Sequence, residues 1–80
     1  MEQEMKETLR RTAEAYAALR GISMQTLGRL AAGDWRFFDR LADDEKTFTA
    51  RKFDEVMLWF SENWPKGSAW PKRVKRPEAA

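Results

Sequence analysis

The side chains best suited to chemistry in this sequence are two arginines placed one helical turn apart. Arg36 and Arg40 are four residues apart, so a helix would place both guanidinium groups on one face. Such a pair can contact phosphates, and an arginine can donate two hydrogen bonds to the edge of a guanine. The alternative is a solvated helix face on which Asp39 and Asp43 form ion pairs with the arginines.

The sequence offers little for catalysis or metal binding. It has no histidine and no cysteine, which removes the commonest general base and the commonest zinc ligands. The acidic run over 43–45 is more typical of a solvated turn than of a cation site, and no nucleophile–base pair is present. We therefore expect neither an enzyme nor a metal site nor a bound cofactor.

Length and charge together predict one small domain with a basic end. Eighty residues, 42% of them apolar, are enough for a single core. Residues 1–64 hold ten basic and twelve acidic side chains, whereas residues 65–80 hold five basic and one acidic. A basic tail favours contact with phosphate, because binding releases counterions from a nucleic acid; a solvated, disordered end is the alternative. We expect a helical domain over 1–64 and a flexible tail over 65–80.

The sequence shows no sign of membrane insertion or export. No apolar run approaches the roughly 20 residues of a membrane-spanning helix. The first residues lack the basic and apolar regions of a signal peptide. We expect a cytoplasmic protein without membrane contact.

Apolar spacing and capping residues predict an all-α chain, a small four-helix bundle. Gly21 is suited to the left-handed residue that ends a helix. Ser23, Asp34 and Thr49 are suited to cap the helices that follow them, and Pro65 ends the last helix. Residues beyond about 66 are expected to lack regular structure. The predicted helices span 3–20, 24–32, 35–42 and 50–63.

Apolar residues on the inner faces of these helices predict the core. Gly28 is expected where the second and third helices cross, because its small size lets two backbones approach. Leu58 and Trp59 lie beside the core face of the last helix, which makes them candidates for a dimer interface or for cover by Trp70 and the tail. The residues expected to be buried together are Leu27, Leu30, Phe38, Leu41, Phe53, Val56, Met57 and Phe60.

Residues 22–41 predict two short helices joined by a tight turn, the pattern of a helix-turn-helix. The pattern consists of Ile22-Ser23, then Gly28, Leu30-Ala31 and Asp34, and finally Phe38 and Leu41. With the helix after Thr49, it resembles the lambda-repressor-like (Cro/CI or XRE-type) regulators over about residues 20–60, half of the chain. Two features depart from that family: Met24 precedes Gln25 where the family often has Gln first, and the third helix opens on aromatic rather than short polar residues.

The resemblance implies a sequence-specific DNA-binding transcriptional regulator, a repressor or autoregulator at the nucleoid. Its third helix, over about 35–42, would enter the major groove of double-stranded DNA. Spare aromatic residues favour a homodimer. The expected contacts are Trp35, Arg36, Phe37, Asp39 and Arg40 on the third helix, Ser23 and Gln25 at the start of the second, and Lys72 and Arg73 in the tail.

Each of these contacts has a structural alternative. Trp35 and Phe37 can fold back over the core, and Ser23 can simply cap its helix. The mildly acidic body, Asp39 and the aromatic third helix favour a second hypothesis, in which a helix-turn-helix scaffold of phage or mobile-element origin binds another protein. The arginines Arg29, Arg36 and Arg40 and the basic tail favour DNA.

Overall fold

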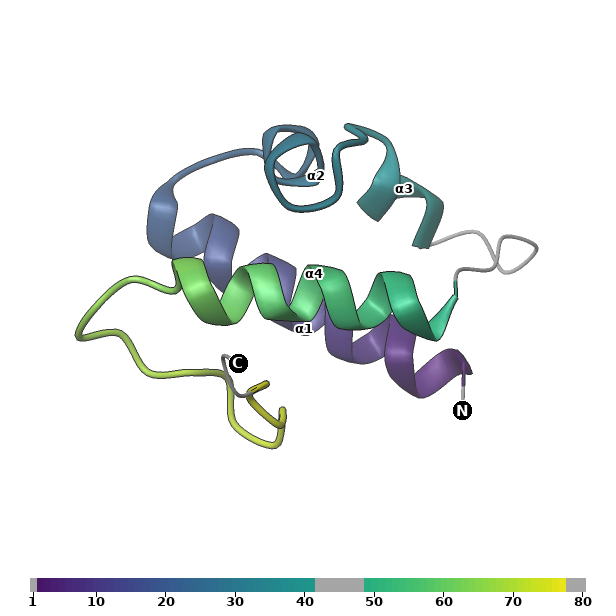
Figure 1. Cartoon of the computed structure of the whole chain (residues 1–80). Coiled ribbons are helices and arrows are strands. Elements are labelled where there is room, and N and C mark those ends of the chain that lie inside the picture. The colour runs from purple at the N-terminus through teal and green to yellow at the C-terminus, as the bar shows by residue number, and fades with distance from the viewer. Residues whose placement is uncertain (1, 42–48, 78–80) are drawn as a thin grey trace.

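The structure is a computed structural model that describes residues 2–41 and 49–77. These residues form four helices and no strand: α1 (Glu2–Arg20), α2 (Met24–Ala32), α3 (Phe37–Leu41) and α4 (Ala50–Asn63). The predicted all-α fold is confirmed. The pair α1 and α4 lies side by side, α2 and α3 cross one side of it, and the chain after α4 folds back across the other side (Figure 1). In this part of the chain, no helix has both the length and the apolar character needed to cross a bilayer.

The helix ends lie where most of the capping residues predict them. Gly21 adopts a left-handed φ of 67° directly after α1. The side chains of Ser23 and Thr49 each accept a hydrogen bond from the backbone N–H three residues on, at 3.1 Å in both cases. These bonds satisfy N–H groups that have no partner within the helix. The last helix ends before Pro65, as expected.

The third helix starts later than predicted. Asp34 Oδ1 accepts a hydrogen bond from the Arg36 backbone N–H at 2.9 Å, and the Asp34 carbonyl accepts one from the Phe37 N–H at 3.0 Å. Trp35 and Arg36 therefore form a turn, and the helix begins at Phe37. The prediction of a helix from residue 35 is wrong because Asp34 stabilises a turn instead of capping a helix directly. Ala42, the expected last residue, lies outside the described residues.

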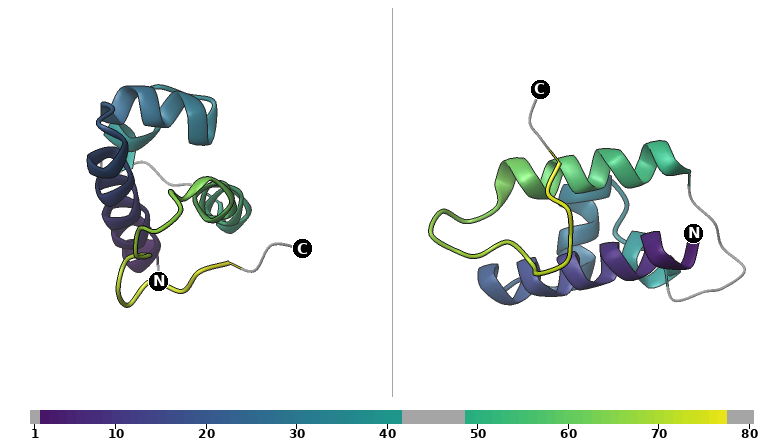
Figure 2. Two further views of the ribbon diagram at one scale, coloured as in Figure 1. Left: turned by 90° about the vertical axis from the view of Figure 1, so that its left-hand side faces the viewer. Right: turned by 90° about the horizontal axis from the view of Figure 1, so that it is seen from below.

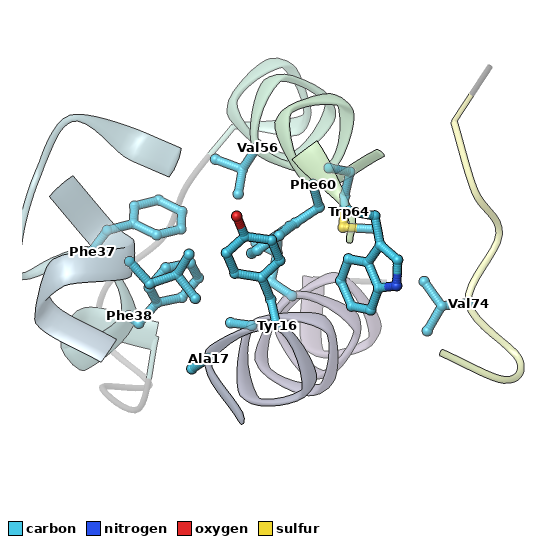
Figure 3. Close-up of a cluster of buried hydrophobic side chains, with 12 residues drawn as sticks. Tyr16, Ala17, Phe37, Phe38, Val56, Phe60, Trp64 and Val74 are labelled. Atoms are coloured by element: carbon cyan, nitrogen blue, oxygen red, sulfur yellow. The ribbon is translucent and has the colours of Figure 1, made fainter. Parts of the chain in front are cut away.

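A row of aromatic rings crosses the core from α3 to the chain after α4 (Figure 3). At its centre, the Phe60 ring centroid lies 6.4 Å from that of Phe38 and 5.6 Å from that of Tyr16. The Trp64 ring follows, 5.7 Å from Tyr16. Phe38 lies at one end of the row, and Val74 packs beyond Trp64 at the other end. The two sides of the bundle therefore share one core.

The predicted core is confirmed in most positions and wrong in one. Leu30 is 54% exposed, whereas Leu27 is fully buried. Ala31, four residues after Leu27, packs against the core instead, because positions four apart share a helix face. Leu41 and Phe53 are half-buried and pack at the edge of the core. The other predicted residues are buried: Phe38, Val56, Met57 and Phe60.

The chain after α4 is irregular, as predicted, but it packs on the bundle. We call residues 65–77 the tail segment. The rings of Trp64 and Trp70 lie 4.8 Å apart, and the Trp70 indole N–H donates to the Val74 carbonyl at 2.8 Å. Arg76 donates to the Ser61 carbonyl at 2.8 Å and to Ser61 Oγ at 3.1 Å. These contacts hold the tail segment against α4, where a flexible, solvated extension was expected.

Candidate nucleic-acid interface

The residues that carry the helix-turn-helix resemblance form a tight corner, which we call the α2–α3 corner (residues 23–41). Gly28 lies where α2 passes the turn before α3. A Cβ atom there would lie 2.6 Å from the Asp34 carbonyl oxygen and 3.3 Å from that of Trp35. Only a glycine allows this approach, so a close backbone contact at this residue is confirmed, although it is made by the turn at Asp34 and Trp35 and not by α3 itself. Gly33 ends α2 in the left-handed conformation, with φ 71°, which turns the chain into the corner.

The two arginines of the predicted site are exposed at this corner. The Arg40 backbone N–H donates to the Arg36 carbonyl at 2.9 Å, so the two residues remain one helical turn apart. The Arg36 guanidinium lies 4.8 Å from the centre of the Trp35 ring. Arg40 Nη1 lies 3.5 Å from Asp34 Oδ2 in a solvent-exposed ion pair. Such a pair contributes little to stability, so Arg40 can exchange Asp34 for a phosphate at little cost.

The aromatic residues of the corner are divided between surface and core. Trp35 is 49% exposed. Phe37 is only 9% exposed, and its ring packs edge-on against Phe38 at 5.1 Å. Phe37 is therefore not available as a surface contact, which corrects the predicted set, because both rings at the start of α3 turn into the core. Asp39 is exposed on the same helix as Arg40.

The start of α2 carries the predicted polar residues on its surface. Ser23 is exposed, and its hydroxyl accepts from the Thr26 backbone N–H, which is the capping role. Gln25 is also exposed, in the first turn of the helix. This end of α2 carries no acidic residue in its first turn, and backbone N–H groups at a helix start favour anions.

The structure does not bring the predicted tail contacts together with this corner. Lys72 and Arg73 are exposed, but they belong to the tail segment, which crosses the opposite side of the α1–α4 pair. Figure 1 and the left view of Figure 2 show α2 and α3 on one side of that pair and the tail segment on the other. In this fold the two sets of residues do not form one continuous surface, contrary to the expectation that they hold one DNA segment together.

The residues that anchor the tail segment were not predicted from the sequence. Val74 is 8% exposed and belongs to the core, and the Arg76 guanidinium lies 5.0 Å from the centre of the Trp70 ring. The signal was present as two apolar residues, Trp70 and Val74, within an otherwise basic stretch. Their spacing has no helical or strand period, so a periodicity analysis passes over them.

Leu58 and Trp59 were expected to form a dimer interface or to be covered by Trp70 and the tail, and the structure changes the second of these expectations. Trp59 is half-buried and packs edge-on against Tyr16, with the ring centroids 5.3 Å apart. Trp70, its expected cover, packs at a tilted angle against Trp64 instead. Leu58 is half-buried as well. Trp59 therefore packs partly within the chain, and only part of its ring is left for contact with another molecule.

On α1, Arg10 and Arg11 form ion pairs, whereas within the described residues no ion pair involves the tail segment. Arg10 contacts Glu7 at 2.6 Å and Glu14 at 3.0 Å, and Arg11 lies 3.5 Å from Glu7. The hydrogen bond from Arg10, with the charges of both arginines, lowers the pKa of Glu7 below its ordinary value. Glu7 in turn raises the pKa of Arg10. In the described residues, no three acidic side chains gather to hold a metal ion; the acidic run over 43–45 lies outside them.

Comparison of the chain with protein-family models, with curated proteins and with solved structures gives no match. The resemblance to lambda-repressor-like regulators therefore stays a prediction from the residues of the corner.

Proposed function

We propose that the protein binds double-stranded DNA through the α2–α3 corner and regulates transcription, as a repressor or autoregulator. The observation that carries the proposal is the placement of Arg36 and Arg40. Both are exposed, lie one turn apart and project from a corner closed by Gly28. Arginine is the side chain most often used to read guanine in the major groove.

In this proposal α2, the turn and α3 act as a helix-turn-helix. Arg36 and Arg40 contact base edges or phosphates, and the polar start of α2 at Ser23 and Gln25 contacts the DNA backbone. Asp39 can accept a hydrogen bond from a cytosine amino group. The described part of α3 is only five residues long, so one corner reaches few base pairs. A homodimer on two half-sites would extend the recognised sequence.

The test begins with selection of bound duplexes from a random pool at low salt. Affinity for the selected site is then measured for the parent, Arg36→Ala and Arg40→Ala, with circular dichroism as a check of folding. Each variant should lose about 1–3 kcal/mol of binding free energy and relax the preference at one base pair. Arg10→Ala, which removes the same charge from the paired face of α1, serves as the control. Failure to enrich any sequence would refute the proposal.

A second candidate function has its own observation. Leu30 is 54% exposed and Trp35 49% exposed, and both belong to the α2–α3 corner. Exposed apolar residues of this size favour contact with another protein. If Trp35→Ala and Leu30→Ala abolish capture of a protein partner while neither arginine affects DNA binding, the corner is a protein-binding surface.

A further inference from the structure

We propose that the tail segment is a second DNA-binding surface, which contacts the phosphate backbone of a separate duplex and lets one chain bridge two DNA segments. The inference rests on the proposed function of the α2–α3 corner. It changes the expected role of the tail cations, which were predicted to support the corner on a single duplex.

The tail segment presents its cations on an ordered turn. The Val74 N–H donates to the Pro71 carbonyl at 3.4 Å, which closes a turn with Lys72 and Arg73 at its two central positions. The turn is anchored on both sides. Val74 is buried in the core, and Trp70 before the turn donates its indole N–H to the Val74 carbonyl at 2.8 Å. The cations therefore occupy defined positions instead of moving with a free chain end, which reduces the entropy lost on binding.

Arg73 adopts an unusual backbone conformation in this turn. Its φ is 66°, and it is the one non-glycine residue in the described chain with a positive φ. A residue with a Cβ atom is strained in this region, which glycine occupies freely. With arginine at this position, the turn places a guanidinium at its tip and accepts strain that a glycine would avoid.

Within residues 2–41 and 49–77, the cations of the turn have no acidic partner. Among the described residues, no carboxylate forms an ion pair with Lys72, Arg73 or Lys75, whereas Arg10 contacts Glu7 at 2.6 Å. Asp54 of α4 lines the same open groove as Arg73 and Lys75, without ion-pair contact to either. A phosphate at this turn therefore does not have to displace a carboxylate first.

The aromatic residues of the tail segment favour a duplex over a single strand. Single-stranded nucleic acids bind through stacking of bases on open aromatic rings. Trp70 is the aromatic residue of this segment, and its ring packs against Trp64 at 4.8 Å and against the Arg76 guanidinium at 5.0 Å. The groups left for a ligand are cations, which contact phosphates without reading sequence.

The position of the turn requires two separate DNA segments. The α1–α4 pair lies between the tail segment and the α2–α3 corner (Figure 2), and the aromatic row of Figure 3 spans the core between them. DNA is stiff over lengths far greater than this molecule. A straight duplex at the corner therefore does not reach the tail turn.

Bridging is tested with two duplexes. One carries the selected site and is immobilised; the other is fluorescent and has an unrelated sequence. The protein, bound to the first duplex, is expected to capture the second. The triple variant Lys72→Ala, Arg73→Ala, Lys75→Ala should bind the selected site within about twofold of the parent but lose at least about tenfold in capture. Its salt dependence on the unrelated duplex should fall by about one unit of slope for each cation removed.

A matched variant removes three cations that form ion pairs on α1 and α4. It carries Arg10→Ala, Arg11→Ala and Arg51→Ala, and it should still capture the second duplex. Arg73→Gly distinguishes the loss of charge from the loss of the turn. Glycine relieves the backbone strain and so keeps the turn, but the variant should still capture less of the second duplex because the guanidinium is gone. The inference is overturned if the triple variant captures the second duplex as well as the parent does. It is also overturned if the variant loses as much affinity for the selected site as it loses in capture of the second duplex. If the protein binds no duplex at any salt concentration, the proposed function fails as well; if it binds one duplex and captures no second, only the bridging inference fails.

Discussion

The two sides of the bundle present positive charge in different ways. At the α2–α3 corner, Arg36 and Arg40 each have a neighbour that orients them: Arg36 lies 4.8 Å from the Trp35 ring, and Arg40 lies 3.5 Å from Asp34. At the tail turn Lys72 forms no ion pair with any described residue. Oriented guanidinium groups suit selective recognition, whereas unpaired cations suit attraction to any phosphate. Under the proposed functions, the same residue types therefore serve different tasks on the two sides.

The two sides also depend on different kinds of packing. The corner relies on a missing side chain, since Gly28 lets the backbone of the turn approach α2 closely. The tail segment relies on large side chains, with Trp70 packed at a tilted angle against Trp64 and with Val74 buried in the core. A single substitution can therefore disturb one side and leave the other intact. A substitution in the shared core should disturb both.

The largest effect is expected from Phe60→Ala. Phe60 is fully buried and lies at the centre of the aromatic row that joins the two sides. Its truncation should cost about 3–5 kcal/mol, which is comparable to the whole stability of a domain this small. Chemical denaturation measures the loss, and both sides should lose their DNA contacts together. Leu30→Ala, at an exposed position, should change stability by less than about 0.5 kcal/mol; equal effects of the two variants would contradict the core assignment.

Trp70→Ala should release the tail segment and leave the corner folded. The ring is half-buried, so its loss should cost about 1–3 kcal/mol, less than that of a fully buried aromatic residue. The readout is limited trypsin digestion, which should cut faster after Lys72 and Arg73 once their turn is no longer anchored. Trp35→Ala, an exposed tryptophan on the other side, is the control. Unchanged cleavage in Trp70→Ala would show that the ring contact with Trp64 does not hold the segment.

Gly28→Ala should open the corner and leave the tail segment in place. Alanine raises helix propensity by about 1 kcal/mol, but its Cβ would lie 2.6 Å from a backbone oxygen, and overpacking costs about 1–3 kcal/mol. We expect a net destabilisation of about 1 kcal/mol. We also expect weaker binding to the selected DNA and unchanged trypsin cleavage at residues 72–73. A variant more stable than the parent would rule out the close approach.

The local parts of this fold are predictable from the sequence. Ser23 and Thr49 cap their helices, and Gly21 ends α1, because each acts on backbone groups within a few residues. Gly28 is predictable for a similar reason, since a small residue in mid-helix indicates a crossing. Such features depend little on the rest of the chain.

The parts that the sequence did not predict depend on longer-range packing or on competing local bonds. Leu30 and Ala31 are equally plausible core residues of a short helix, and only the positions of its neighbours decide that Leu30 stays exposed. Phe37 is buried because α3 starts two residues late, after the turn made by Asp34. Val74 is buried through an irregular segment that has no period to detect. The sequence therefore predicted that Arg36 and Arg40 lie one turn apart, but it did not predict where α3 begins or that Phe37 is buried.

The smallest effect is expected at Glu7, the ion-pair partner of Arg10. It distinguishes a cation that has an acidic partner, such as Arg10, from Lys72, which has none among the described residues. The hydrogen bond and charge of Arg10 lower the pKa of Glu7 in the folded chain, so the unfolded chain takes up this proton first as the pH falls. The ion pair therefore stabilises the fold above the ordinary pKa of a glutamate, and its contribution is lost as the pH falls through the lowered folded pKa.

Glu7→Gln should accordingly lower the melting temperature slightly near neutral pH, and the difference from the parent should vanish in acid. Because the pair is exposed, added salt should also reduce the difference. Lys72→Gln offers the matched comparison, since Lys72 has no ion-pair partner among the described residues. The difference in melting temperature between Lys72→Gln and the parent should not change as the pH is lowered. The difference in duplex capture should become smaller as salt is added. A Glu7→Gln difference that persists in acid would mean that Glu7 acts through something other than its charge.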